Sequence, residues 1–227
     1  MNPLLDTHVV STGTDPKCTV VWLHGLGADG FDFAPIVPEL VSPDWPAIRF
    51  VFPHAPVRPV TINNGYRMRA WYDLSNLEFE DRADIAGVNE SITQIDDLID
   101  DQIRQGASPD CLFLAGFSQG GAVVLSYLLR GKHRVRAAIA LSTYLPDMRN
   151  AIPDAQQSGR ETGTRIFMAH GTHDPVVPFT GGERSSRALS ELGFDVAWHS
   201  YPIQHEVGAI ELQDLRHWLG QILTKEC

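Results

Sequence analysis

The sequence predicts an α/β protein in which helices cover both faces of a mostly parallel central sheet. Short apolar segments alternate with longer amphipathic segments along most of the chain, which is typical of successive βαβ units. Most apolar segments are continuous rather than alternating, as expected for strands that are buried on both faces. We interpret residues 1–227 as one domain, because no insertion between the predicted strands is long enough for a separate lid domain.

This pattern gives the approximate bounds of each element. The predicted strands cover residues 19–23, 48–52, 111–116, 137–141, 165–169 and 196–201. The predicted helices cover residues 33–41, 84–105, 119–129, 182–192 and 207–223. Residues 53–82 and 146–164 are expected to form loops, the second because of its polar, proline- and glycine-bearing content. Loops of this length in a compact domain often carry function.

Charge and composition argue against several classes of protein. The chain has 18 basic and 28 acidic residues, a net charge of -10. Such a surface repels the phosphates of nucleic acids and anionic lipid faces. The N-terminal residues lack the basic and apolar parts of a signal peptide, and no apolar run reaches the roughly 18–20 residues that span a bilayer. We therefore expect a cytoplasmic protein with no transmembrane segment and no nucleic-acid partner.

Neither the cysteines nor the acidic clusters indicate a metal site. Cys18, Cys111 and Cys227 lie at unrelated spacings. We expect Cys18 and Cys111, each at the start of an apolar segment, to pack as small hydrophobic residues rather than to form a disulfide or a zinc site. The polar side of the helix predicted at 84–105 carries four aspartates: Asp96, Asp97, Asp100 and Asp101. They lack the glycine turn of a calcium loop, so we interpret them as a solvated helix face.

The strongest functional motif is G-F-S-Q-G at residues 116–120, which fits the G-x-S-x-G nucleophile elbow. It follows the apolar run of one predicted strand and leads directly into a predicted helix. Such a turn holds its serine, here Ser118, in a strained backbone conformation at the top of the sheet. Gly116 and Gly120 lack the β-carbons that would collide where strand and helix meet. A serine that merely caps a helix is the alternative, but the context favours a nucleophile.

A serine hydroxyl needs a general base, and position in the sheet selects His205 among nine histidines. His205 follows the last predicted strand and so lies at the same sheet edge as Ser118. Asp174 follows the preceding strand, although an aspartate before proline is also a common turn residue. The chain order Ser118, Asp174, His205 is that of the α/β-hydrolase fold. We therefore predict this fold, with these three residues as the catalytic triad.

A glycine-rich loop after the first predicted strand completes the predicted site. In this architecture one oxyanion donor is the backbone N–H after the nucleophile, here that of Gln119. The other comes from a loop after an early strand, for which the N–H of Leu26 is the best candidate. We interpret the loop as part of this site rather than as a nucleotide site, because it lacks the Lys-Ser/Thr pair of a P-loop. We expect His24 to make a structural hydrogen bond within the loop.

Five motifs in one order resemble a known family. They are L-H-G-L-G-A-D-G at 23–30, F-P-H-A-P at 52–56, A-W-Y-D at 70–73, G-F-S-Q-G-G at 116–121 and H-G-T-H-D-P-V-V-P at 170–178. They resemble the acyl-protein thioesterase/carboxylesterase (phospholipase/carboxylesterase) group of small α/β-hydrolases over nearly the whole chain. The resemblance implies a triad of Ser118, Asp174 and His205, with Leu26 and Gln119 as oxyanion donors.

The resemblance also implies where a substrate binds. Trp71 and the loop around it are expected to border the acyl-binding groove, with Tyr144 and Val177 as further substrate contacts. The segment L-S-T-Y-L-P at 141–146 is more similar to the bacterial carboxylesterase branch, because similar eukaryotic thioesterases often carry tryptophan at the position of Tyr144.

One departure from the family pattern lies beside the general base. Relatives often have glycine or methionine before the histidine and serine after it, whereas this chain has Q-H-E at 204–206. The departure bears on the polarity of the groove and so on the preferred acyl chain. Glu206 either interacts with the imidazole of His205 or caps the following helix, and we favour the cap.

Together these features predict a serine hydrolase that cleaves carboxylic esters or thioesters without a metal or cofactor. The resembling family includes small-ester carboxylesterases, lysophospholipases and acyl-protein thioesterases, so the acyl substrate is either a small molecule or a lipid. A non-catalytic ligand-binding α/β-hydrolase is the alternative from another class, but such proteins usually lose a triad member. We expect a monomer or a homodimer.

Overall fold

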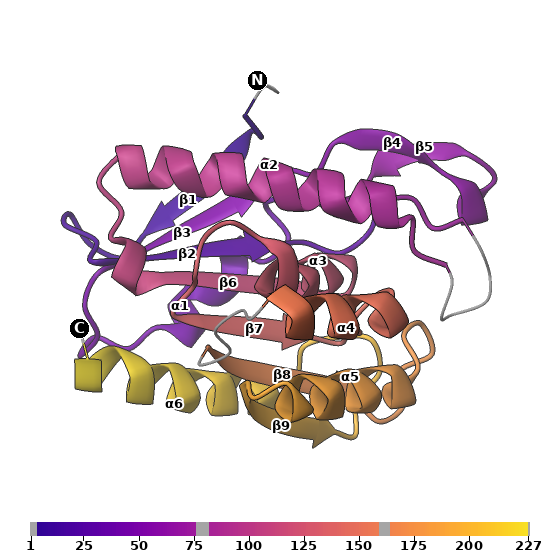
Figure 1. Ribbon diagram of the computed structural model, residues 1–227. Coiled ribbons are helices and arrows are strands. Elements are labelled where there is room, and N and C mark those ends of the chain that lie inside the picture. Colours follow the sequence, from indigo (N-terminus) through magenta and orange to yellow (C-terminus); the bar gives the residue numbers. More distant parts are fainter. Residues whose placement is uncertain (1–3, 76–81, 159–163, 227) are drawn as a thin grey trace.

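A seven-stranded sheet lies at the centre of the computed structural model, which describes residues 4–75, 82–158 and 164–226 (Figure 1). The strand order is β1-β3-β2-β6-β7-β8-β9. Only the pairing of β1 with β3 is antiparallel, and every other neighbouring pair in this sheet is parallel. The strands are β1 (Thr7–Ser11), β2 (Cys18–Leu23), β3 (Ile48–Pro53), β6 (Leu112–Phe117), β7 (Ala137–Leu141), β8 (Arg165–Gly171) and β9 (Asp195–Tyr201).

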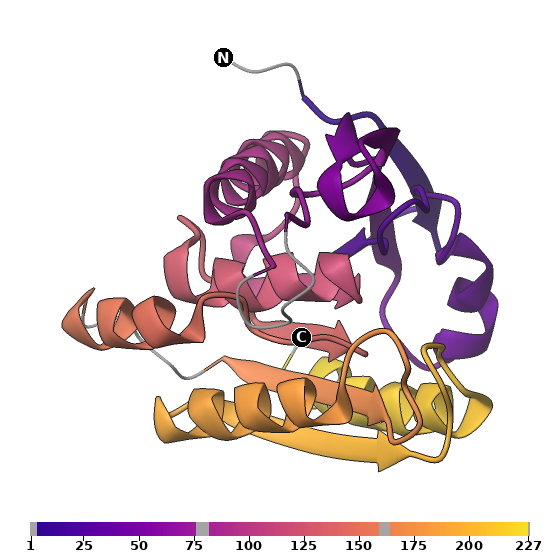
Figure 2. The same ribbon diagram turned by 90° about the vertical axis from the view of Figure 1, so that its right-hand side faces the viewer.

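Helices cover both faces of this sheet, which confirms the predicted layers (Figure 2). One face carries α2 (Ile85–Arg104), α3 (Gln119–Arg130), α4 (Met148–Ser158) and α5 (Phe179–Glu191), and the other carries α1 (Val37–Leu40) and α6 (Ala209–Glu226). Successive side chains of β2 point alternately to the two faces of the sheet. Val21 packs into the core under α2 and α3, and Val20 and Trp22 pack into the core under α1 and α6. Burial on both faces explains why the strands read as continuous apolar runs.

The segment predicted as a loop at 146–164 contains α4, so that prediction is wrong for the described part of the segment. The fully buried residues of α4 among those described are Ala151 and Ala155, one helical turn apart, and the partly buried Met148 and Ile152 pack against the same core beside α3. Alanine is small and weakly apolar, and Pro153 lies inside the helix. Both features hide the helical period in the sequence.

The segment predicted as a loop at 53–82 also contains regular structure. Within it, β4 (Val57–Val60) and β5 (Tyr66–Arg69) form a separate antiparallel pair joined through the 3-10 turn Thr61–Asn63. Asn64 and Gly65 both have positive φ, and Asn-Gly is the dipeptide that such hairpin turns favour. Residues 76–81 of the predicted loop lie outside the described residues. The short edge strand β1 was likewise absent from the prediction.

Smaller differences concern the ends of elements. The helix predicted at 33–41 is a 3-10 turn at Ala34–Ile36 followed by one turn of α1. Helix α5 begins three residues before its predicted start, and α6 begins two residues after it. Helix ends are commonly uncertain by this amount in sequence-based assignment. Within the described residues, no helix combines the length and apolar character needed to cross a membrane.

Cys18 and Cys111 form a disulfide, which corrects the expectation that they pack as free thiols. Strands β2 and β6 are parallel neighbours, with Thr19 paired to Leu112, so the residues immediately before this pair lie side by side. Their Cα atoms are 4.8 Å apart, within the normal range for a disulfide. The two cysteines are 93 residues apart in the sequence, and only the pairing of the two strands brings them together.

Candidate active site

Ser118 lies between β6 and α3 with φ 52° and ψ -117°, a conformation that costs a non-glycine residue about 1–3 kcal/mol. Its N–H donates to the carbonyl of Leu141 on the neighbouring strand, at 2.9 Å. A β-carbon on Gly116 would lie 2.5 Å from the backbone of Gly120, and one on Gly120 would lie 2.4 Å from the carbonyl of Leu23. The two glycines therefore allow the close approach that the elbow motif predicts.

The three residues predicted as a triad lie within hydrogen-bonding distance of one another. The hydroxyl oxygen of Ser118 is 2.9 Å from Nε2 of His205, and Nδ1 of that ring is 2.7 Å from Oδ2 of Asp174. A carboxylate accepts hydrogen bonds, so the proton of the neutral imidazole lies on Nδ1 and Nε2 is left to accept from the serine hydroxyl. The aromatic ring of Phe117 packs against His205, with ring centroids 4.8 Å apart.

Asp174 is held from three directions and its side chain has no exposed surface. One carboxylate oxygen accepts the N–H groups of Val176 and Val177, at 2.8 and 2.9 Å. The other, which faces His205, also lies 3.3 Å from Nε2 of His170. His170 is buried and its Nε2–H donates to the carbonyl of Val177 at 3.0 Å. Burial lowers the pKa of His170, so the ring stays neutral.

His170 is a residue whose part in the site the sequence reasoning missed, although it lies in the quoted motif four positions before Asp174. Its ring contacts both the carboxylate and the backbone of the turn that holds the carboxylate. The spacing of four residues was the available signal, because it places both side chains at the end of the same strand. We assign His170 as a positioning residue for Asp174.

Replacing His170 with leucine is expected to lower kcat about tenfold with little change in KM, because Asp174 loses one polar contact and the carbonyl of Val177 loses its donor. His170→Gln keeps an N–H donor and should restore part of the rate. Ester hydrolysis kinetics check this. The matched control is His173→Leu, an exposed residue of the same segment. Equal losses in the leucine and glutamine variants would contradict the positioning role.

The two predicted oxyanion donors belong to segments that meet at Ser118, since a β-carbon on Gly25 would lie 3.6 Å from the β-carbon of Ser118. Gln119 begins α3, and Leu26 lies in the loop after β2. Neither backbone N–H donates to another group within the described residues. The loop itself is held by backbone hydrogen bonds from Gly27 to the carbonyl of Arg69, at 2.9 Å, and from Ala28 to Gly25, at 3.3 Å. Two unused donors beside a serine hydroxyl are what an oxyanion hole requires.

His24 makes the structural hydrogen bonds that were predicted for it. Its Nε2 accepts the N–H of Ala55 at 3.0 Å, and Nδ1 lies 2.7 Å from the carbonyl of Gly25. Burial lowers the pKa of His24 to about 4, so the ring is neutral and can accept at one nitrogen while it donates at the other.

The glycines of this loop do have the G-x-G-x-x-G spacing of a dinucleotide motif at 25–30. However, no helix begins there, because the next element is the 3-10 turn Ala34–Ile36. A dinucleotide site needs a helix N-terminus at that point. The interpretation as a non-nucleotide loop therefore agrees with the local structure.

Trp71 does not border a groove in the way that was predicted. The residue is fully buried, its indole N–H donates to the carbonyl of His24 at 2.9 Å, and Ser91 donates to its carbonyl. The side chain of Gln119 accepts from the N–H of Trp71 at 2.9 Å and donates to the carbonyl of Tyr72 at 2.8 Å. Trp71 thus supports the loop after β2 through the carbonyl of His24, and a substrate has no access to the buried indole in this conformation.

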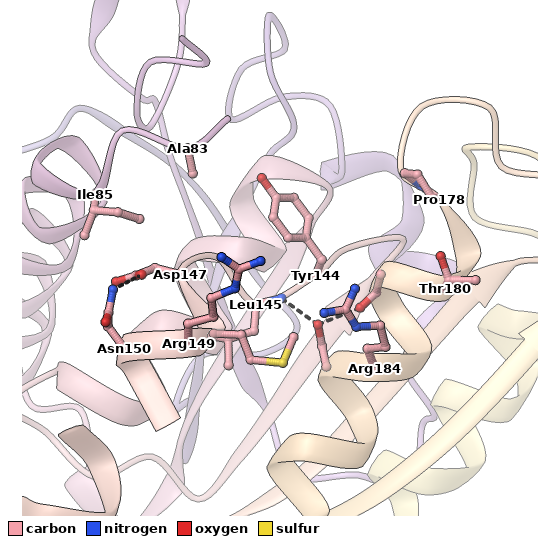
Figure 3. Close-up of a pocket in the computed structure, with 13 residues that line it drawn as sticks. Ala83, Ile85, Tyr144, Leu145, Asp147, Arg149, Asn150, Pro178, Thr180 and Arg184 are labelled. Atoms are coloured by element: carbon pink, nitrogen blue, oxygen red, sulfur yellow. Dashed lines mark hydrogen bonds between the residues drawn. The ribbon is translucent and has the colours of Figure 1, made fainter. Parts of the chain in front are cut away.

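The other two predicted substrate contacts differ in position. Val177 is buried, and its backbone is part of the turn around Asp174. Tyr144 lines a pocket of about 450 Å³ (Figure 3), which lies between the first turns of α4 and α5. Arg82 donates to the hydroxyl of Tyr144 at 3.2 Å and lies over its ring. Of the three, only Tyr144 faces a space that a substrate can enter.

Residues 5–223 match the family model described as phospholipase/carboxylesterase. The chain belongs to this family. Among curated proteins, it is 32% identical over 222 residues to an acyl-protein thioesterase 1 of Cryptococcus neoformans, which covers 90% of this chain and 92% of that protein. It is also 32% identical over 207 residues to the carboxylesterase SOBER1 of Arabidopsis thaliana, which covers 90% of each chain.

Solved structures of a carboxylesterase and of an acyl-protein thioesterase are similar to the structure of this chain. The crystal structure of Arabidopsis thaliana SOBER1 has a TM-score of 0.82 and 32% identity, and the match covers 91% of this chain and 99% of that one. That of Zea mays acyl-protein thioesterase 2 has a TM-score of 0.81 and 29% identity, and the match covers 96% and 99%. The predicted α/β-hydrolase fold is confirmed, and the chain is an enzyme of a hydrolase family.

The side chain that caps the helix after His205 is that of Glu211 rather than that of the predicted Glu206. Helix α6 begins at Ala209, and Oε2 of Glu211 accepts the N–H of Gly208 at 3.2 Å. Glu206 is exposed and precedes the first turn, so its carboxylate is too early in the chain for this contact. Glu211 is 1% exposed, and burial raises its pKa to about 7, an effect that the Gly208 N–H partly opposes.

Replacing Glu211 with glutamine should change how the stability depends on pH. The ordinary pKa is 4.5 and that in the fold is about 7, so between these values the folded protein keeps a proton that the unfolded chain has lost. Relative to Glu211→Gln, the wild type should therefore lose roughly 2–3 kcal/mol of unfolding free energy as the pH rises from 4.5 to 8. Urea denaturation of both proteins at several pH values measures this. Parallel pH curves would contradict it, and Glu206→Gln serves as the exposed control.

Proposed function

We propose that this protein is a serine hydrolase that cleaves carboxylic esters, and thioesters, through an acyl-enzyme on Ser118. The observation that carries the proposal is the continuous chain of contacts from the Ser118 hydroxyl through the His205 imidazole to the Asp174 carboxylate, at 2.9 and 2.7 Å. It lies beside two unused backbone donors at the carboxyl edge of a parallel sheet, where ligands of such folds bind.

The mechanism follows from these positions. His205 accepts the proton of Ser118 at Nε2 while the serine oxygen attacks the acyl carbon. Asp174 keeps the ring in the required tautomer and stabilises the imidazolium that forms. The N–H groups of Leu26 and Gln119 donate to the oxyanion of the tetrahedral intermediate. The imidazolium then protonates the leaving alcohol or thiol, and a water molecule activated by His205 releases the acid.

The geometry of the site determines the type of reaction more closely than it determines the natural acyl substrate. We favour small carboxylic esters, because residues 4–75, 82–158 and 164–226 form no separate lid domain over the proposed site. The related proteins named acyl-protein thioesterase make a lipid thioester on a protein the second candidate, and a lysophospholipid the third. The similarity of residues 141–146 to bacterial carboxylesterases stays a prediction, and the relatives with 32–34% identity described among curated proteins are fungal and plant proteins.

The test combines labelling with a substrate series. A fluorophosphonate probe should modify the protein once, and mass spectrometry of its peptides should locate the adduct on Ser118. Matched oxygen esters and thioesters with acyl chains of two to sixteen carbons then rank the three substrate candidates. A protein that neither reacts with the probe nor hydrolyses any member of the series would instead be a non-catalytic ligand-binding module.

Three further expectations stay predictions. We propose that residues 1–227 form a single catalytic domain that works as a monomer or homodimer. We also propose a cytoplasmic location, although Cys18 and Cys111 form a disulfide, a bond that is rare in that compartment. We propose no metal or cofactor, because each step above uses only side chains and backbone groups of this chain.

A further inference from the structure

The carbonyl of Ser118 belongs to the same peptide group as one proposed oxyanion donor, the N–H of Gln119. Two groups donate to this carbonyl. The hydroxyl of Thr143 does so at 2.7 Å, and the N–H of Ala122 does so at 3.0 Å as part of α3. A backbone carbonyl oxygen has two lone pairs, so both are used here. The orientation of the peptide group is therefore fixed from its carbonyl side.

Fixing the carbonyl also fixes the direction of the N–H. This peptide group is trans and planar, so its C=O and N–H point in opposite directions. Gln119 is the first residue of α3, where an N–H finds no acceptor within the helix. Hydrogen bonds along a chain of groups also polarise one another, so a donor at the carbonyl makes the N–H a stronger donor. The Thr143 hydroxyl thus affects both the direction and the strength of a proposed oxyanion donor.

The end of β7 contacts both backbone groups of the nucleophile residue. Leu141, the last residue of β7, accepts the N–H of Ser118 at 2.9 Å, and Thr143 donates to the carbonyl of Ser118. Between these two residues, Ser142 has a φ of 47°, which is strained for a residue other than glycine. Such strain persists only where the surrounding structure determines it, and it is frequent at active sites. The chain turns at Ser142, and the hydroxyl of the next residue returns to Ser118.

The second glycine of the G-F-S-Q-G-G motif gives Thr143 the space for this contact. A β-carbon on Gly121 would lie 2.7 Å from Cγ2 and 2.8 Å from Cβ of Thr143, closer than β-carbons approach other atoms. Thr143 is buried, so its side chain has no other space to occupy. The approach of strand and helix at the elbow explains Gly116 and Gly120, and the packing of Thr143 explains Gly121.

We propose that Thr143 is a positioning residue for the oxyanion hole, which acts through the peptide group between Ser118 and Gln119. The inference rests on the proposed esterase function, because the oxyanion forms only in that reaction. Removal of an oxyanion donor itself typically lowers the rate about 100- to 1000-fold. Thr143 acts one step further away, and a neutral hydrogen bond of this kind corresponds to a loss of up to about tenfold.

Two substitutions separate the hydroxyl from the shape of the side chain. Thr143→Val keeps the branched shape and removes the hydroxyl, while the Ser118 carbonyl keeps the N–H of Ala122, so the fold should persist. It should lower kcat for an oxygen ester about tenfold and change KM less than about twofold. Thr143→Ser keeps the hydroxyl and should keep kcat within about threefold of the wild type. Steady-state hydrolysis kinetics measure these values.

The matched control makes the same chemical change away from the site. Thr164 is also buried, and its hydroxyl also donates to a backbone carbonyl, that of Val135 at 3.2 Å. It directly precedes β8, so it lies at the sheet edge opposite the triad. Thr164→Val should keep the kcat and KM of the wild type.

A second substrate distinguishes a weaker oxyanion hole from general damage. In a thionoester, sulfur replaces the carbonyl oxygen, and sulfur accepts hydrogen bonds weakly, so the reaction depends less on the oxyanion donors. Thr143→Val should therefore lower the ratio of kcat/KM for the oxygen ester over that for its thionoester, by about threefold or more. The control Thr164→Val should keep the wild-type ratio.

Two outcomes would overturn the inference. An unchanged kcat in Thr143→Val would show that the hydroxyl has no effect on the reaction. Equal losses on the ester and the thionoester, or no recovery in Thr143→Ser, would give the residue a structural role alone. If the wild type still hydrolyses the ester and is labelled at Ser118, either outcome leaves the proposed function standing. A wild type that hydrolyses no ester would instead contradict that function.

Discussion

Replacing Ser118 with alanine is expected to lower ester hydrolysis by about 10⁵–10⁶-fold, which is the scale of loss when a serine nucleophile of a triad is removed. The acyl-enzyme then has no oxygen on which to form, and the remaining catalysis comes from the oxyanion donors and substrate binding alone. The variant should also show no labelling by a fluorophosphonate. Steady-state hydrolysis and intact-mass measurement of the labelled protein check both expectations.

A matched control separates loss of the nucleophile from damage to α3. Ser126 lies on the same helix and its hydroxyl donates to the carbonyl of Ala122 at 2.8 Å, away from the triad. Ser126→Ala should keep most of the activity and react with the probe. Alanine keeps the β-carbon and removes only the hydroxyl, so the backbone strain at the φ of 52° is unchanged, and the variant should keep the fold, as circular dichroism should show. Near-normal turnover by Ser118→Ala would refute the proposed mechanism.

Removing the disulfide between Cys18 and Cys111 should lower the free energy of unfolding by about 3–5 kcal/mol. The bond closes a loop of about 93 residues, and a loop of that size restricts the unfolded chain strongly. Urea denaturation of the wild type, with and without a reducing agent, should show this loss as a lower midpoint. The double variant Cys18→Ala and Cys111→Ala should be insensitive to the reductant.

Counting thiols gives an independent test of the same bond. The sequence contains three cysteines, two of which form the disulfide. The denatured protein should therefore take up one equivalent of a thiol reagent per chain before reduction and three equivalents after it. Cys227→Ala is the control, and it should retain the wild-type response to reductant. Three reactive thiols in the unreduced protein, together with an unchanged midpoint on reduction, would contradict the bond.

The parts of the site that the sequence could predict are those defined by local context. Ser118 was identified because a strand, a serine between glycines and a helix follow one another directly. Asp174 and His205 were identified because each follows its own strand, and parallel strands place such residues at one edge. The structure brings all three together. Each inference needed only the order of the elements, which a continuous pattern of apolar residues reveals.

The parts that the sequence could not predict depend on contacts between distant segments. The buried position of Trp71 depends on partners 47 and 48 residues away: the carbonyl of His24 accepts from its indole N–H, and the side chain of Gln119 accepts from its backbone N–H. The disulfide depends on which strands are neighbours, since nothing in the spacing of Cys18 and Cys111 indicates that β2 and β6 are adjacent. Helix α4 was missed because the residues it buries fully are alanines and Pro153 interrupts it, so the hydrophobic contrast along the segment is weak and its packing against α3 defines it.

The double engagement of Gln119 has a practical consequence for anyone who scans this enzyme by mutagenesis. The proposed oxyanion donor is a main-chain group, which no replacement of the side chain removes. Its carboxamide, in contrast, bridges to residues 71 and 72. A lower rate in Gln119→Ala would therefore result from a displacement of the segment at residues 71 and 72. It would not measure the contribution of the backbone N–H of residue 119 to the oxyanion hole.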